Sequence, residues 1–264
     1  MTQVSELAQK DPPPRHSRTG GLLRVTGTLM IAAGVLLLAW ALLVWQWQDP
    51  FTAVFTHLEQ AHLKSEYQRR AATFTPRVHV RLQHDGRPTE TDLAAARRGV
   101  AAEAADYAAS LKRGDAVGRL KIGRIGLDMY VVQGTDHSTL KKGPGHYIDS
   151  ALPGQGKLIY VAGHRTTYLA PFSDIDDIRV GDYVTFTVPY GTFTYRVTRH
   201  YVVASNATQV LVDHGREILR LQACHPRFFA THRYLVDARL VAFSPRGQAT
   251  TFDVSRLAQA RTAG

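Results

Sequence analysis

The sequence Glu217-Ile-Leu-Arg-Leu-Gln-Ala-Cys-His-Pro226 decides how the rest of the chain is interpreted. Its alternating residues predict a β-strand, and Pro226 ends that strand just beyond Cys224. Cys224 is the only cysteine of the protein, so no internal disulfide can form. The thiol is therefore a buried inert side chain, one half of an intermolecular bridge, or a nucleophile.

The composition is that of a folded protein with excess positive charge. Hydrophobic residues make up 44% of the 264 residues, which is ample for a packed core, and the formal net charge is +10. Such a charge suits nucleic acid, an anionic membrane surface or the anionic polymers of a cell envelope. The topology of the chain, rather than its composition, separates these partner classes.

The stretch Val25–Trp45 has no charged residue and predicts a membrane-spanning helix, with a transmembrane anchor at 25–47. As an α-helix the stretch is about 32 Å long, enough to cross a hydrocarbon core of about 30 Å. A cleaved signal peptide is the alternative, because Ala39-Trp-Ala41 has the Ala-x-Ala form. The apolar stretch is longer than the usual signal-peptide core, however, and this favours an anchor that is retained.

Flanking charge predicts the orientation of this anchor. Basic residues crowd the preceding segment 1–24, whereas the next Lys or Arg after the span is Lys64. The positive-inside rule then makes 1–24 a cytoplasmic tail and places everything after residue 47 outside the cell. An outside domain has no access to nucleic acid, so we expect no nucleic-acid partner.

The sequence pattern divides the remaining chain into a helical part and a β-rich part. Residues 48–114 predict a helical stalk or linker, whereas 115–245 contain about eight short strands separated by turns. With short helical insertions at 135–142 and 173–178, this predicts a mainly β fold, either an antiparallel barrel or a sandwich, before a polar tail at 246–264. The predicted strands are 118–125, 129–132, 157–162, 183–188, 192–203, 210–212, 218–224 and 233–243.

A reactive thiol needs an acid or base beside it, and the chain has 12 histidines. His225 follows Cys224 in the strand, so its side chain points to the opposite face. His164 ends an apolar strand, and Gly163 before it allows a bend or the close approach of another segment. A histidine at a strand end suits acid/base chemistry, and a structural or solvent-exposed histidine is the alternative.

A cation near the thiol is the third requirement. Arg220, Arg227 and Arg233 are the nearest in sequence, and a hairpin would bring Arg233 back alongside Cys224. These residues alone do not rank Arg233 above Arg227. The chain has no Cys-x-x-Cys, His-Glu-x-x-His, P-loop or dinucleotide-binding motif, so we expect no metal or organic cofactor.

Three motifs in this order resemble the sortase family. They are Ala162-Gly-His-Arg165, Leu221-Gln-Ala-Cys224 and Arg233-Tyr-Leu-Val236. The segments Leu152-Pro-Gly-Gln-Gly156, 164–172 and Gly181-Asp182 are most similar to the class E branch. The resemblance covers about residues 115–245, which is the predicted catalytic domain.

The resemblance implies an eight-stranded sortase-type β-barrel and a membrane-anchored cysteine transpeptidase of Gram-positive bacteria. His164, Cys224 and Arg233 match the family's catalytic positions. Tyr168, in the loop after His164, and Ala223, where the family usually has threonine, are expected to contact the substrate. The implied substrates are secreted proteins with a C-terminal sorting signal, Leu-Pro-x-Thr-Gly or Leu-Ala-x-Thr-Gly, cleaved between Thr and Gly. The implied acceptor is an amine of a peptidoglycan precursor or a pilin.

Two other functions fit the same sequence. An envelope cysteine peptidase would use the same three residues but let water resolve the thioester. A non-catalytic envelope-binding barrel would keep the fold without needing a reactive thiol.

Overall fold

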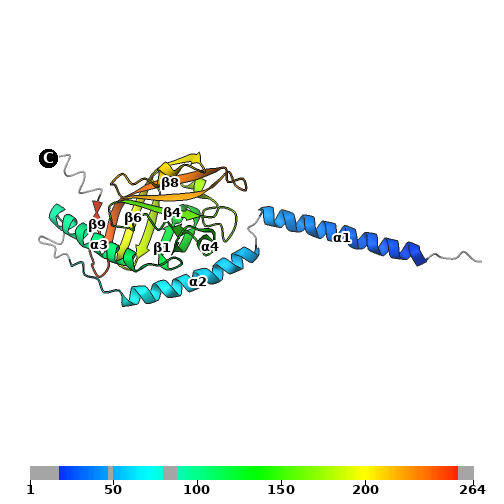
Figure 1. Cartoon of the computed structure of the whole chain (residues 1–264), viewed down its shortest axis with the longest axis horizontal. Coiled ribbons are helices and arrows are strands. Elements are labelled where there is room, and N and C mark those ends of the chain that lie inside the picture. Colours follow the sequence, from blue (N-terminus) through cyan, green and yellow to red (C-terminus); the bar gives the residue numbers. More distant parts are fainter. Residues whose placement is uncertain (1–17, 47–49, 80–87, 255–264) are drawn as a thin grey trace, which may run out of the picture. The chain divides into compact units, whose positions relative to one another are not determined.

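The computed structural model describes residues 18–46, 50–79 and 88–254 (Figure 1). It forms two compact units, Met1–Trp47 and Gln48–Gly264. Most of the predicted cytoplasmic tail (1–17) and the end of the predicted C-terminal tail (255–264) lie outside the described residues.

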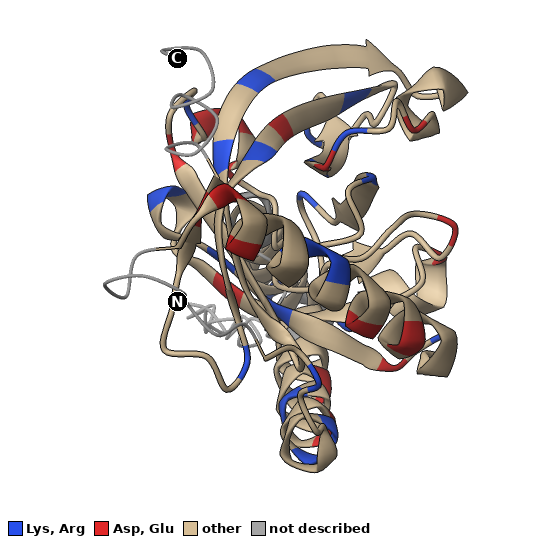
Figure 2. Cartoon of the chain, turned by 90° about the vertical axis from the view of Figure 1, so that its left-hand side faces the viewer, with Lys and Arg blue, Asp and Glu red and all other residues tan. Residues whose placement is uncertain are grey.

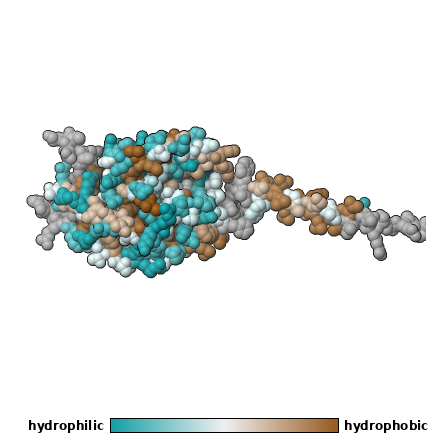
Figure 3. Space-filling view, in the orientation of Figure 1, coloured by the Kyte–Doolittle hydropathy of each residue, from teal (hydrophilic) through white to brown (hydrophobic). Residues whose placement is uncertain are grey.

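The first unit contains helix α1 (Arg18–Gln46). Within the described residues, its segment Leu23–Leu42 is the one stretch long and apolar enough to cross a membrane. Its 20 residues extend about 30 Å, which matches a hydrocarbon core. Apolar side chains cover its surface (Figure 3). This helix corresponds to the span that the sequence predicts.

The second unit is built on one closed sheet. The strand order is β6-β5-β1-β2-β3-β4-β7-β8-β9, and β6 also pairs with β8, so eight strands close into a barrel with β9 attached to β8. The predicted mainly β, eight-stranded barrel is therefore confirmed. The strands are β1 (Ala116–Ile122), β2 (Leu127–Gln133), β3 (Gly145–His146), β4 (Leu158–Gly163), β5 (Tyr183–Val188), β6 (Gly191–Ala204), β7 (Ile218–His225), β8 (His232–Pro245) and β9 (Phe252–Asp253).

Some pairings and elements differ from the sequence prediction. The β2–β3 and β4–β7 pairs are parallel, whereas an all-antiparallel barrel was expected. The predicted strand 210–212 is wrong: the short 3-10 helix η3 (Thr208–Leu211) occupies this position. Val210 is buried against Tyr160 and Leu235, and three apolar residues are too few to distinguish a strand from a helical turn.

Strand β4 explains how the barrel buries two hydrophobic clusters. All of its residues are buried, as its uninterrupted apolar sequence predicts. Ile159 and Val161 belong to the main core inside the barrel. Tyr160 and Ala162 point to the other face, where a second cluster includes Leu235. A strand that is buried on both faces gives the site described below a rigid base.

The helix α3 (Glu90–Ser110) packs onto the main core of the barrel. It begins with a capping box between Thr89 and Asp92. Val100 and Ala104 are fully buried in the core, and the Tyr107 hydroxyl donates to the backbone carbonyl of Ala116 (3.0 Å). The surface around α3 carries both signs of charge, interspersed over helices and strands (Figure 2).

The helix α2 (Pro50–Thr73) contacts strands β1 and β2. The buried Thr56 hydroxyl donates to the carbonyl of Lys141 (2.9 Å), next to the short helix α4 (His137–Leu140). The Gln60 amide donates to the Tyr130 carbonyl (2.9 Å), and its carbonyl accepts from the Tyr130 amide (2.7 Å). Polar side chains, together with the fully buried Leu63, thus join α2 to the barrel.

His146 on β3 is a buried titratable group in the wall of the barrel. Its side chain is 1% exposed, and its Nε2 lies 2.9 Å from the carbonyl oxygen of Ala151. Burial lowers the pKa of His146 to about 4, although the hydrogen bond to Ala151 opposes the shift. The folded protein therefore holds this imidazole neutral.

We expect His146 to make stability fall in acid. Between an unfolded pKa of about 6.5 and the folded value of about 4, the unfolded chain binds more protons, so the free energy of unfolding decreases as pH falls. The loss reaches about 3 kcal/mol at pH 4. Urea unfolding of the full chain in a non-ionic detergent should show a shallower pH dependence for His146→Gln than for wild type. The exposed His62→Gln is the control, and an unchanged slope in His146→Gln would contradict the assignment.

Candidate active site

Three neighbouring strands bring the predicted site residues together. β7 lies between β4, which is parallel to it, and β8, which is antiparallel. The register pairs Gly163 with Ala223 and Cys224 with Arg233. His164 follows Gly163 directly, so it is level with Cys224. Opposed residues project to the same face of a sheet, so His164, Cys224 and Arg233 form one row.

Two further rows lie on the same face and lead away from this one. In one of these rows Arg220, one of the three candidate cations, lies opposite Asp237. Arg220 donates to both Asp237 oxygens (2.6 and 2.8 Å), and the two side chains are 5% and 2% exposed. Arg220 is therefore a buried structural cation. The rows are Ala162–Gln222–Leu235 and Tyr160–Arg220–Asp237.

The other two arginines differ in how they are engaged. Arg227 donates to the Ser173 carbonyl (2.6 Å) and to Asp174 (2.9 Å), on the lead-in to the short 3-10 helix η2 (Ile175–Asp177). Arg233 uses Nη1 on the carbonyls of Ala230 (2.8 Å) and His232 (2.9 Å). Among the described residues, its Nε and Nη2 have no acceptor in reach. Arg233 is therefore the arginine that faces the thiol with donors still available.

His164 lies half-buried beside other rings and cations. Its ring centroid is 5.3 Å from that of Tyr168 and 6.4 Å from that of His137. Its Nε2 is buried and, within the described part of the chain, has no hydrogen-bond partner. Burial, and then the positive charges of His137 and Lys141, lowers the pKa of His164. At neutral pH the imidazole is thus held neutral, with one nitrogen left for a substrate or the thiol.

The loop after His164 has a strained backbone that α2 supports. Tyr168, Leu169 and Ala170 have φ values of 54°, 59° and 37°, a conformation that costs free energy in residues other than glycine. The Tyr168 amide donates to Thr52 Oγ1 of α2 (3.2 Å). The Phe55 ring packs edge-on against the Tyr168 ring at 6.4 Å. The loop therefore depends on a helix that lies more than a hundred residues earlier.

Gly163 allows this loop to return close to the strand. A Cβ at Gly163 would lie 2.6 Å from the ring of Phe172, which is fully buried. The sequence left open a bend or a close approach at this glycine, and the close approach is what the structure has. Any larger residue here would push Phe172 away and move His164 with it.

Arg165 is a residue that the sequence analysis did not single out. It is 4% exposed, and its Nη1 lies 2.9 Å from His225 Nδ1. It also donates to the Ser173 carbonyl (3.2 Å) and pairs with Asp176. It therefore fixes the strand end from the face opposite the thiol, the face predicted for His225. Its position after His164 was the only sequence signal for it.

Ala223, which the resemblance places among the substrate contacts, has its side chain on the inner face of the sheet. Ala223 is fully buried and belongs to the main core of the barrel. Because side chains alternate along β7, Ala223 faces inward while Cys224 faces outward. A methyl group at this position fills the core and does not reach the row of site residues.

Comparison with known proteins identifies the domain. The family model described as Sortase domain matches residues 120–241. Sortase E from Streptomyces avermitilis is 32% identical, over 51% of this chain and 93% of that protein, with a TM-score of 0.46. The chain belongs to the sortase family. The family prediction from the three motifs is therefore confirmed.

Further relatives of this sortase include a curated protein and another solved structure. Sortase D of Bacillus subtilis (strain 168) is 33% identical over 132 residues, 48% of this chain and 65% of that protein. The chain spans just under two thirds of the length of the curated relatives it matches. A Sortase D5 transpeptidase of Clostridium perfringens shares the fold, with a TM-score of 0.54 and 21% identity over 69% of this chain and 98% of that one.

Proposed function

We propose that this sortase is a cysteine transpeptidase that uses Cys224 as nucleophile. The observation that carries the proposal is the row formed by His164, Cys224 and Arg233 across β4, β7 and β8. A half-buried thiol, a neutral imidazole and a guanidinium with free donors on one face are the groups that acyl transfer needs. The family membership supports the same chemistry.

In the first half of the reaction, Cys224 attacks the carbonyl carbon of the threonine in a sorting motif. His164 takes the thiol proton and delivers it to the leaving glycine amine as the C–N bond breaks. Arg233 donates hydrogen bonds to the oxyanion, a contribution of a few kcal/mol when such donors are preorganised. The product is a thioester between Cys224 and the N-terminal part of the substrate.

In the second half, an amine resolves the thioester. The amine attacks the thioester carbonyl, His164 accepts the amine proton and then returns a proton to the departing Cys224 sulfur. The acceptor that we propose is an amine of a peptidoglycan precursor or of a pilin. The neutral state of His164 in the resting enzyme suits this step, because the imidazole must accept a proton from the amine.

We also propose that α1 anchors this domain to the cell membrane. The helix has the length and composition of a membrane span, and basic residues precede it. The positive-inside rule then places residues 1–24 in the cytoplasm and the barrel outside, where secreted substrates pass.

The substrate proposal concerns the residue before the variable position of the sorting motif. Tyr168 lies beside His164 and offers an apolar ring with one hydroxyl. A hydroxyl can accept from the backbone N–H of alanine, which proline lacks. We therefore propose a Leu-Ala-x-Thr-Gly motif in preference to Leu-Pro-x-Thr-Gly, in agreement with the class E resemblance.

Substitution of the three site residues tests the catalytic proposal. Cys224→Ala should abolish thioester formation, since the chain has no other thiol. His164→Ala and Arg233→Ala should each lower kcat/KM by at least about 100-fold, the usual scale for an acid/base group or an oxyanion donor. Arg227→Ala is the matched control and should stay within a few-fold. Cleavage and ligation are measured with a sorting-motif peptide plus an amine; hydrolysis alone in excess amine would indicate a peptidase instead.

Protease treatment of intact cells tests the topology. We expect an added protease to remove the barrel domain, because the charge asymmetry around α1 places it outside. The control is a cytoplasmic protein, which must stay intact. A barrel that is degraded only after lysis would reverse the orientation.

A comparison of two peptides tests the role of Tyr168. Wild type should prefer the Leu-Ala-x-Thr-Gly peptide by about 5- to 100-fold in kcat/KM, the range that one unpaired buried polar group accounts for. Tyr168→Phe should remove most of this preference, whereas Tyr183→Phe, at an exposed site on β5, should keep it. A preference for proline in wild type, or one for alanine that persists in Tyr168→Phe, refutes the hydrogen-bond explanation.

A further inference from the structure

A second site lies at the other end of β7. It is a pocket of about 510 Å³, which we call the arginine pocket. It begins beside Glu217, the residue before β7, whereas Cys224 lies near the end of that strand. At about 3.3 Å per residue the two are about 20 Å apart, so the arginine pocket is separate from the row of site residues. It is lined by Arg97, Arg98, Val100, Ala101, Gly154, Gln155, Gly156, Phe193, Gly215, Arg216, Glu217, Arg239, Leu240, Phe243 and Val254.

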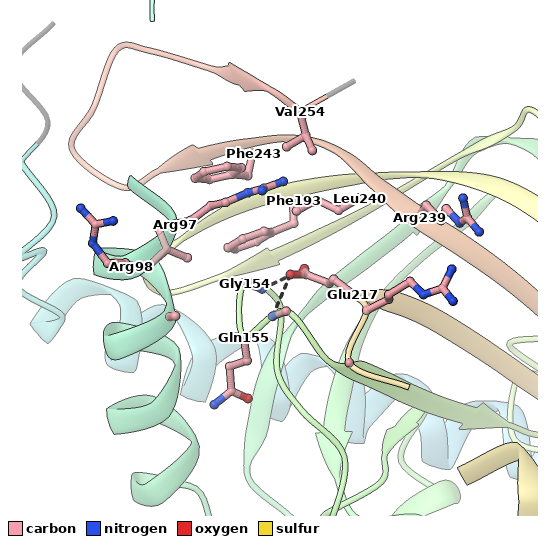
Figure 4. Close-up of a pocket in the computed structure, with 15 residues that line it drawn as sticks. Arg97, Arg98, Gly154, Gln155, Phe193, Glu217, Arg239, Leu240, Phe243 and Val254 are labelled. Atoms are coloured by element: carbon pink, nitrogen blue, oxygen red, sulfur yellow. Dashed lines mark hydrogen bonds between the residues drawn. The ribbon is translucent and has the colours of Figure 1, made fainter. Parts of the chain in front are cut away.

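Four exposed arginines surround the arginine pocket: Arg97, Arg98, Arg216 and Arg239. Figure 4 shows Arg97 extending toward the rings of Phe193 and Phe243, whereas Arg98 points away. Among the described residues, none of the four has a carboxylate oxygen within 4 Å. Most other arginines of the barrel form an ion pair with a carboxylate, so this cluster differs in having no direct ion pair.

The one acid of the arginine pocket is already engaged. Glu217 accepts from the backbone amides of Gly154 (2.9 Å) and Gly156 (3.1 Å), and from the Tyr195 hydroxyl (2.7 Å). Both of its oxygens are thus turned to the 154–156 loop and to the barrel (Figure 4). It stabilises the wall of the pocket, and although its charge interacts with Arg97, it forms no direct ion pair with any of the four guanidinium groups in the described part of the chain.

The floor of the arginine pocket is apolar. The rings of Phe193 and Phe243, stacked at 6.0 Å, are buried beneath it, and the partly exposed Leu240 and Val254 provide its apolar surface. A cationic rim over an apolar floor fits a ligand with anionic groups on a carbon skeleton. Several arginines together suit a ligand with repeated anionic groups, because each guanidinium can donate two parallel hydrogen bonds to the two free oxygens of one phosphodiester.

The course of α2 shows at which end of the barrel the arginine pocket lies. Its first turn contacts the loop after His164, through Thr52. Just past its other end, the ring of Phe74 packs on Tyr190, whose hydroxyl donates to the Pro153 carbonyl next to Gly154. The arginine pocket is therefore at the end of the barrel away from the point where the chain arrives from α1.

We propose that the arginine pocket binds a phosphodiester-linked polyol chain, an anionic polymer of the cell envelope. The proposal rests on the proposed function in so far as it takes the barrel to be outside the cell. Phosphate groups pair with Arg97, Arg216 and Arg239, and the carbon skeleton lies on the apolar floor. The chain's own tail after Val254 is a poor occupant, because residues 255–264 include Arg256 and Arg261 and no acidic residue.

Binding measurements on the full chain in a non-ionic detergent test this proposal. The probe is a synthetic glycerol-phosphate decamer, compared with uncharged polyglycerol of the same length, with inorganic phosphate and with phosphatidylglycerol vesicles. We expect saturable binding of the decamer that weakens with added salt, and at least 10-fold weaker binding of the other three. Arg97→Gln/Arg239→Gln should weaken decamer binding at least 10-fold. Arg69→Gln/Arg179→Gln, which removes the same charge from exposed positions elsewhere, should change it less than twofold.

The outcomes separate this proposal from its alternatives. Equal losses in the two double variants would show non-specific charge attraction and overturn it, as would equal binding of polyglycerol or tighter binding of the lipid vesicles. Hydrogen exchange locates the contact: the decamer should protect 154–156 and 215–217, and protection confined to segments that do not line the pocket would refute the site. Peptide cleavage, measured on the same samples, should be unchanged in Arg97→Gln/Arg239→Gln. If wild type binds the decamer but does not cleave the peptide, the catalytic proposal is refuted and the binding proposal stands.

Discussion

The register between β7 and β8 is the constraint on which the site depends. A shift of one residue would turn every side chain of β7 to the other face, so the position of Cys224 requires a fixed register. The buried pair Arg220–Asp237 provides it, because the two residues are directly opposed and joined by two hydrogen bonds. Four residues further along β7, the same register opposes Cys224 and Arg233. A buried ion pair contributes little net stability, but it penalises wrong pairings strongly.

The sequence predicts the parts of the fold that have a regular pattern. The alternation in 218–224 and 233–243, with a short connection between them, predicts the hairpin that pairs Cys224 with Arg233. The apolar run before His164 likewise predicts the doubly buried strand β4. These elements carry His164, Cys224 and Arg233, whereas the choice of Arg233 over Arg227 came from the resemblance to the sortase family. Their catalytic roles remain predictions.

Other features have no pattern that a single sequence reveals. The strands β3 and β9 have two residues each, too few for an alternation. Part of the packing of α2 rests on single polar residues such as Thr56 and Gln60, which look like any exposed helix face until their partners are known. The direction of the Ala223 side chain follows from alternation along β7, which turns it into the barrel when Cys224 faces outward.

The attachment of α2 to the loop after His164 has a mechanical consequence. Residues 47–49 are all that separates α1 from α2, so a force between the two compact units enters the barrel at the first turn of α2. That turn carries Thr52, the hydrogen-bond partner of the strained Tyr168 backbone. Tension on the N-terminal helix is therefore transmitted through Thr52 to the loop that borders His164. A load applied to α1 would therefore act on the backbone conformation of the loop beside His164.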